Sequence, residues 1–175
     1  KTFKMLNIGD SLTANDLAVM LKAKLVDLGA NVTMTGTVNT PTALKSEGHG
    51  NWSFNHFIGK SSNASSYIEL YPTGQTTTNW QNAFLKLATE EDKTNHPDWC
   101  FRHSPSPGVA TELSFTEDPD KTGDFYIFDF AWYLSAHELE TPDIITIALG
   151  TNDNNIADMR FGLEVMIKQI KTALP

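Results

Sequence analysis

A serine near the start of the chain, in the stretch Gly9-Asp10-Ser11-Leu12, has the surroundings of an attacking group. Residues 3–8 before it form a short apolar run, and a helical pattern follows it. A side chain between the carboxyl end of a parallel strand and a helix N-terminus lies where open α/β sheets bind ligands. Unpaired amides and the positive end of the helix dipole favour a negative oxygen there. The same stretch taken alone fits a plain entry into a helix equally well.

Two further stretches contain groups able to donate hydrogen bonds to such an oxygen. The first, Ser46-Glu-Gly-His-Gly-Asn-Trp52, follows the second expected strand and is therefore expected on the same sheet edge as Ser11. Its glycines let a backbone amide approach a reacting carbonyl. The second, Gly150-Thr-Asn-Asp153, follows a third strand and offers the Asn152 amide. Each stretch alone also fits a turn, in which Asn and Asp act as caps.

Apolar spacing predicts the elements that carry these stretches. Residues 3–8 are expected to form a buried strand, and four leucines share one helical face after it: Leu17, Leu21, Leu25 and Leu28. Gly29 suits the left-handed position that ends a helix, and Thr13 with Asp16 predicts an approximate capping box at its start. Alternation over residues 31–38 predicts a second strand. Two strands joined by a crossover helix run parallel, so we expect a layered α/β fold.

Another strand, followed by another helix, is expected near the C-terminal end of the sequence. Residues 144–149 are too apolar to face water, and helical spacing follows at Ile156, Met159, Leu163, Ile167, Ile170 and Leu174. In between, residues 80–88 suit a helix, and residues 95–122 suggest a long surface excursion of the kind that serves a site. The aromatic run at residues 125–134 favours a helix packed over the sheet more than a cleft wall.

Together, the three polar stretches resemble the sequence blocks of the SGNH hydrolases, also called GDSL esterases and lipases. The matching residues are Gly9-Asp10-Ser11-Leu12, Gly48 within the second stretch, and Gly150-Thr-Asn-Asp153. The resemblance covers nearly the whole of residues 9–153. It implies a single domain over residues 1–175 with the three-layer α/β/α, flavodoxin-like SGNH fold and a parallel central sheet.

The resemblance also implies a mechanism with assigned roles. Ser11 Oγ attacks an ester carbonyl, while the Ser11 amide, the Gly48 amide and the Asn152 side chain hold the oxyanion. Asp10 and Asp153 are expected to order their turns rather than to transfer protons. No metal ion and no organic cofactor is needed for this chemistry.

The substrate implied is a small acyl ester. The Glu-Gly-His-x-x-Trp form of the second stretch is similar to the branch of the family that acts on acylated carbohydrates, so we expect an acetylated saccharide, with His49 and Trp52 contacting it. A lipase or lysophospholipase is the alternative within enzymes. A non-catalytic module that binds a glycan or a partner on the same fold is the alternative from another class.

The fourth block of the family, Asp-x-x-His, is missing. The residue three positions before a histidine is never Asp, whether that histidine is His49, His56, His96, His103 or His137. The resemblance implies two more strand-helix units beyond residue 175, about 60 residues at about 30 each. We therefore expect a truncated enzyme whose bare sheet edge attracts a second chain or a swapped copy. His49 is the alternative base within the chain, although a wall position suits it better.

The composition of the chain limits its partners and the kinds of site that it can form. Thirteen Lys and Arg against 21 Asp and Glu give a net charge of −8, which disfavours nucleic acid and anionic membranes as partners. No apolar run approaches the roughly 20 residues that span a bilayer. The single Cys100 excludes an internal disulfide and a cysteine-based zinc site. A start at Lys1 with no signal-like segment fits a processed chain, which favours a secreted or periplasmic protein.

Overall fold

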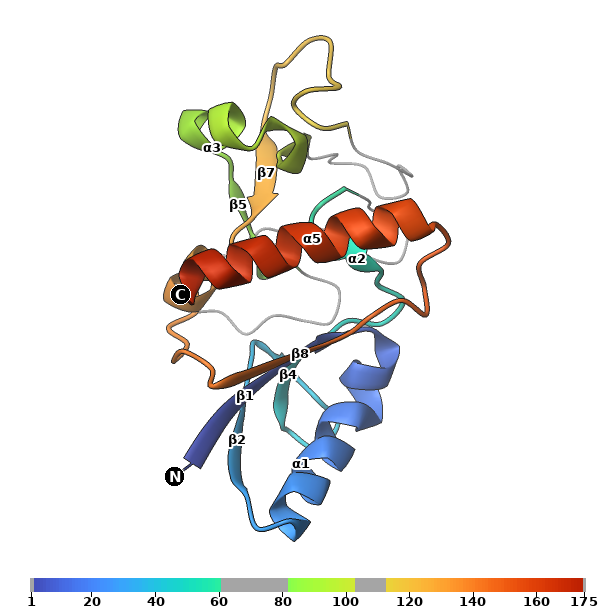
Figure 1. The fold of residues 1–175 in the computed structure, drawn as a ribbon, viewed down its shortest axis with the longest axis vertical. Coiled ribbons are helices and arrows are strands. Elements are labelled where there is room, and N and C mark those ends of the chain that lie inside the picture. The colour runs from blue at the N-terminus through green and yellow to red at the C-terminus, as the bar shows by residue number, and fades with distance from the viewer. Residues whose placement is uncertain (1, 61–81, 103–112, 175) are drawn as a thin grey trace.

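The main sheet is mostly parallel and is built around one central strand (Figure 1). The computed structural model describes residues 2–60, 82–102 and 113–174. Strand β1 (Thr2–Gly9) pairs in parallel with β2 (Asn31–Thr35), with β8 (Ile144–Ala148) and, at its last residues, with β4 (Lys45–Gly48). The short β3 (Val38–Asn39) runs antiparallel to β4. The prediction of an α/β fold with a mainly parallel sheet is confirmed.

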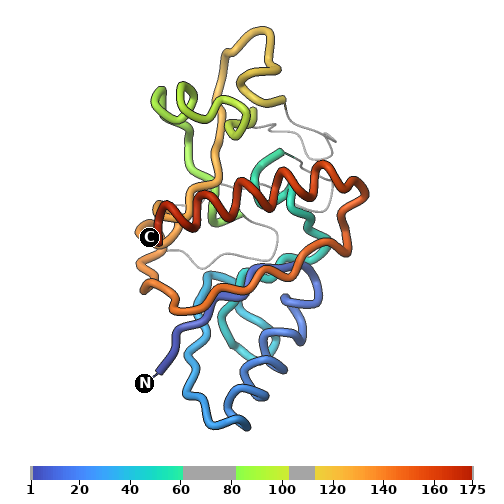
Figure 2. Tube along the Cα trace, in the orientation of Figure 1, coloured from blue at the N-terminus to red at the C-terminus, as the bar shows by residue number. Residues whose placement is uncertain are grey.

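Helices lie on both faces of this sheet (Figures 1 and 2). Alternate residues of a strand point to opposite faces. Met5 packs in a small core beneath α1 (Ala18–Asp27), whereas Leu6 and Ile8 belong to the larger core beneath α5 (Ile156–Ala173). The central strand is therefore buried from both sides, as its apolar sequence predicts.

The first helix begins earlier than the sequence predicts. A π-helical turn, Thr13–Leu17, precedes α1, and the Thr13 side chain is buried with no hydrogen-bond partner for its Oγ1. The expected capping box of Thr13 and Asp16 is therefore wrong, because Asp10 already caps the turn by accepting the Leu12 N–H at 3.0 Å. The predicted end of the helix is confirmed: Gly29 has φ +83°. Leu28, expected on the buried face, is 72% exposed.

The strand predicted over residues 31–38 is broken at Gly36. Its φ is +142°, and a side chain there would overlap the Ser46 carbonyl of the neighbouring strand. Val38 consequently leaves β2 and enters β3. The buried and exposed residues of β2 alternate as expected, with Val32 and Met34 buried.

The middle of the chain differs most from the prediction. The helix expected over residues 80–88 is wrong for residues 82–88, which contain the strand β5 (Leu85–Leu87); residues 80 and 81 lie outside the described part. A small antiparallel sheet forms in the order β5-β7-β6. The remaining elements here are α2 (Phe54–Phe57), α3 (Glu90–Asn95), the 3₁₀ turn η2 (Pro97–Trp99), β6 (Phe101–Arg102), β7 (Phe125–Phe128) and α4 (Phe130–Ala136).

The aromatic run at residues 125–134 is split between β7 and α4 instead of forming one helix. Asp129 divides it, because its side chain accepts the Trp132 N–H at 2.8 Å and starts α4. The expectation that these rings pack rather than line a cleft is confirmed for most of them, since Phe128, Phe130 and Tyr133 have no exposed surface. Of the excursion expected over residues 95–122, residues 103–112 lie outside the described part.

The strand and helix predicted near the far end are confirmed as β8 and α5. Although four of its five residues are apolar, β8 is only half-buried, and Ile144 is 38% exposed. Among the strands that the structure describes, β8 pairs only with β1.

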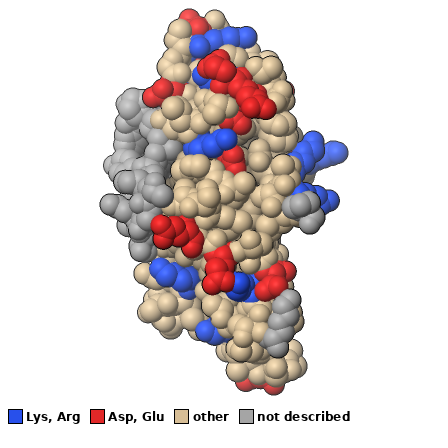
Figure 3. All heavy atoms as spheres, turned by 90° about the vertical axis from the view of Figure 1, so that its left-hand side faces the viewer, with Lys and Arg blue, Asp and Glu red and all other residues tan. Residues whose placement is uncertain are grey.

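The surface carries charges of both signs. Figure 3 shows acidic and basic side chains interspersed over one face. In the described ranges, we find no helix with the length and apolar character needed to cross a membrane.

Candidate active site

The three polar stretches meet at the carboxyl ends of three neighbouring strands. Gly9 lies opposite Gly48 in the β1–β4 pair and opposite Ala148 in the β1–β8 pair. Backbone hydrogen bonds continue past these strand ends: the His49 N–H donates to Gly9 O at 2.9 Å, and the Asp10 N–H donates to Ala148 O at 3.4 Å. The structure therefore brings together stretches that are separated by about 40 and 100 residues in the sequence.

Ser11 stands at the first helical turn after β1 and is half-buried. Asp10 holds this turn through two acceptors, since its side chain takes the Leu12 N–H and its carbonyl takes the Ala14 N–H at 2.9 Å. A side chain at Gly9 would overlap Thr13 Oγ1, so only glycine allows the turn to close this tightly. Ser11 Oγ makes no hydrogen bond within the part of the chain that the structure describes.

Gly48 packs directly against the helix that carries Ser11. A side chain at Gly48 would overlap the backbone of Ala14, so the close contact between β4 and the helix requires glycine here. The Gly48 N–H donates to Ser46 Oγ at 3.2 Å in a buried position. The predicted oxyanion donor is thus beside the Ser11 turn, but its proton is directed at a hydroxyl of its own strand.

The third stretch is attached to the second by side-chain hydrogen bonds. Asn152 Nδ2 donates to Trp52 O at 3.1 Å, and Asp153 accepts the Phe54 N–H at 3.2 Å. Burial, together with the nearby negative charge of Asp10, raises the pKa of the Asp153 carboxyl above its usual range. Both aspartates therefore accept backbone N–H groups at the turns that hold the site.

His49 and Trp52 lie in the core rather than at a surface. Both side chains are fully buried, and their rings stack with centroids 4.1 Å apart. The Phe57 ring meets the His49 ring edge-on at 5.2 Å. The expectation that these two residues contact a substrate finds no support in this arrangement, because neither offers surface to a ligand.

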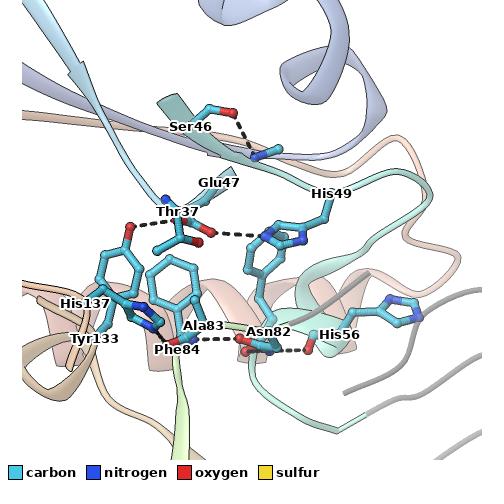
Figure 4. A network of polar contacts seen from close by, with 12 residues as sticks. Thr37, Ser46, Glu47, His49, His56, Asn82, Ala83, Phe84, Tyr133 and His137 are labelled. Carbon is cyan, nitrogen blue, oxygen red and sulfur yellow. Dashed lines mark hydrogen bonds and ion pairs between the residues drawn. The ribbon is translucent and has the colours of Figure 1, made fainter. Parts of the chain in front are cut away.

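A buried carboxylate beside Gly48 was not anticipated from the sequence. Glu47 has no exposed surface and accepts three hydrogen bonds, from the Thr37 N–H at 2.5 Å, from the Tyr133 hydroxyl at 2.8 Å and from His49 Nε2 at 3.2 Å (Figure 4). Burial, with the adjacent Glu47 carboxylate, holds the pKa of the Tyr133 hydroxyl well above its usual range. The available signal was a lone acidic residue in a strand immediately before the candidate glycine.

No histidine in the described ranges is hydrogen-bonded to Ser11. His56 Nδ1 lies 2.8 Å from Ser53 Oγ, and burial lowers the pKa of His56 to about 4. His96 stacks on Trp99 with ring centroids 4.2 Å apart, His137 Nε2 lies 3.3 Å from Ala83 O, and His103 is outside the described part. Across residues 2–60, 82–102 and 113–174, no three acidic, His or Cys side chains are grouped to hold a metal ion.

Comparisons of the chain with protein families, with curated proteins and with solved structures found no match. The class that the fold defines is therefore the broad one: a mixed α/β protein whose candidate site lies at the carboxyl edge of a mostly parallel sheet.

Proposed function

We propose that this protein is a serine esterase of the SGNH type that hydrolyses a small acyl ester. The observation that carries the proposal is the convergence of the Ser11, Gly48 and Asn152 stretches at adjoining strand ends. A serine, a glycine amide and an asparagine amide are the groups that acyl transfer requires for attack and for stabilising the oxyanion.

In the proposed reaction, Ser11 Oγ attacks the ester carbonyl carbon and gives up its proton to a base. The negative oxygen of the tetrahedral intermediate is held by the Ser11 and Gly48 amides and by Asn152. The intermediate collapses to an acyl-serine as the alcohol leaves with a proton, and water then releases the acid. Because the Gly48 N–H now donates to Ser46 Oγ, oxyanion binding exchanges that hydrogen bond for a charged and stronger one.

The proposal assigns the base to an Asp-x-x-His pair on a further segment or second chain that pairs with β8. This edge suits such a partner, because β8 is apolar except for Thr146 and pairs only with β1 among the described strands. A second copy of this protein fits the edge, but residues 1–175 contain no Asp-x-x-His, so a copy of these residues alone does not supply the base.

The length of the acyl group in the proposed substrate is a separate point. The proposed substrate is an acetylated saccharide, but two exposed apolar residues favour the lipase alternative. Leu12, which follows Ser11 directly, is 61% exposed, and Ile156, at the start of the helix after the third stretch, is 80% exposed. Their side chains suit contact with an acyl chain longer than acetyl.

The test compares wild type with Ser11→Ala on p-nitrophenyl acetate and p-nitrophenyl octanoate, with the intact mass of each sample measured in parallel. Turnover that Ser11→Ala abolishes supports the esterase, and the ratio of the two kcat/KM values decides between acetyl and longer acyl groups. Equal rates for the two proteins would refute the esterase and leave the non-catalytic binding module. A mass above that of 175 residues, or a co-purifying chain with Asp-x-x-His, identifies the source of the base.

A further inference from the structure

The Glu47 carboxylate is in an energetically unfavourable place. It has no exposed surface and lies among the rings of the larger core, where an ionised group without partners is strongly destabilising. Three donors compensate for the lost water. Packed apolar residues often serve stability as well as a buried polar network does, so stability alone does not explain a carboxylate here.

The network brackets one residue, Gly48. Glu47 and His49 are two residues apart along an extended segment, so their side chains point to the same side, and Figure 4 shows them facing each other. Gly48 lies between them and faces the opposite side, against the Ala14 backbone. The Gly48 peptide is therefore held between the helix that carries Ser11 and the Glu47–His49 pair.

The pair is itself anchored from outside the strand. The Tyr133 hydroxyl reaches Glu47 from α4, 86 residues away in the sequence, and the Thr37 N–H reaches the same oxygen from the segment before β3. On the other side, His49 stacks on Trp52, whose carbonyl accepts the Asn152 side chain. One continuous set of contacts thus runs from α4 to two of the proposed oxyanion donors, the Gly48 amide and the Asn152 side chain.

We propose that Tyr133 and Glu47 are positioning residues that fix the Gly48 amide for oxyanion binding, acting through His49. This inference rests on the proposed esterase function. It gives the buried carboxylate the role of holding the Gly48 amide in place. Displacing an oxyanion donor by a fraction of an ångström weakens binding of the transition state more than it weakens binding of the substrate.

Tyr133→Phe is the first test, because it removes one hydroxyl and keeps the ring. We expect kcat for the p-nitrophenyl ester to fall about tenfold with KM within about twofold, as the loss of one hydrogen bond to a charged group predicts. Amide hydrogen exchange at Gly48, followed by NMR, should speed up by a similar factor. Tyr126→Phe, the same change at a tyrosine of the same core, is the matched control and should alter neither quantity.

Glu47→Gln is the second variant, which keeps the shape of the side chain and one acceptor oxygen, whereas an NH2 donor replaces the other oxygen. We expect Glu47→Gln to have a higher kcat and a slower Gly48 amide exchange than Glu47→Ala. If the carboxylate were purely structural, the kcat of each variant would follow only its folded fraction. The inference is overturned if Tyr133→Phe and Glu47→Ala, both folded, leave kcat and Gly48 exchange at wild-type values. If Ser11→Ala shows that the esterase proposal fails, Gly48 exchange alone still decides whether this network holds the amide.

Discussion

Ser46 and Gly48 form the contact in the site that most directly opposes the proposed chemistry. The Gly48 N–H is directed at Ser46 Oγ, and the bond is buried. In the proposed reaction, the oxyanion would compete with this hydroxyl for the Gly48 N–H, and the transition state would replace the neutral Ser46–Gly48 hydrogen bond. The balance between these two acceptors is a property that a single substitution can test.

Ser46→Ala removes the competing acceptor. The buried Gly48 N–H is left without a partner, so the free energy of unfolding should fall by about 1–3 kcal/mol in urea titrations. The kcat for a p-nitrophenyl ester should stay the same or rise, because the transition state no longer displaces the hydroxyl. Ser135→Ala, at an exposed hydroxyl on α4, is the control for both measurements. A tenfold loss of kcat would show that Ser46 helps the reaction.

His56 makes stability depend on pH. Burial lowers its pKa to about 4, from 6.5 in the unfolded chain. Between these two values the unfolded chain binds more protons, so stability falls as pH drops from 6.5 to 4 and is fully retained above 6.5. His56→Asn, which keeps an acceptor for the Ser53 N–H, removes this dependence. Between pH 7 and pH 5, wild type should lose about 2 kcal/mol more than the variant in urea unfolding. Parallel losses in the two proteins would count against this explanation.

At the scale of elements, the strands and helices with one clear period were predictable. The apolar runs at residues 3–8 and 144–149, the helix after residue 156 and the stop at Gly29 follow from spacing and capping alone. The break at Gly36 was not predictable, because it depends on the Ser46 carbonyl of another strand. The aromatic run at 125–134 has no single period. Asp129 caps α4 within this run, so the helix begins after it although the apolar pattern continues through it.

Asp129 has two roles in the structure, since it caps α4 and pairs with Lys86 of β5 at 2.8 Å. Asp129→Ala should lower the free energy of unfolding by about 1–2 kcal/mol, mostly through the lost cap. Asp129→Asn keeps an oxygen for the Trp132 N–H and should lose less than about 1 kcal/mol, because the ion pair is partly exposed. Thermal or urea unfolding of the two variants separates these contributions. Equal losses would assign the effect to the ion pair instead.

At the scale of the whole molecule, the sequence predicted which strand ends meet better than how the groups at those ends are hydrogen-bonded. Three strands entering from distant parts of the chain share one carboxyl edge, which follows from parallel pairing alone. The hydrogen bonds of the Gly48 amide and of Glu47 depend on Ser46, Thr37 and Tyr133, and a pattern along the chain does not encode such contacts. The small sheet β5-β7-β6 also escaped prediction, because its strands have only two to four residues.

The edge at β8 gives a prediction for assembly. If this apolar strand pairs with a second copy, sedimentation velocity should show a concentration-dependent dimer. Ile144→Lys places a charge on the half-exposed strand and should shift the protein towards monomer with little loss of folded structure. Leu28→Lys, at an exposed position of the first helix, is the control and should leave the dimer unchanged. A wild-type protein that is monomeric at all concentrations would rule out the swapped copy as the partner.

The separation of 86 positions between Glu47 and Tyr133 affects how this protein is made. During synthesis, β1, α1 and β4 leave the ribosome well before α4 does, and until α4 arrives Glu47 lacks its tyrosine donor. We therefore expect the Glu47 carboxylate of the partial chain to favour water over the core, which disfavours closure of the early elements before α4 docks. Ser11 and Gly48 would then acquire their final geometry only after the later elements have docked, so a half-made chain would lack the arrangement that the proposed reaction needs.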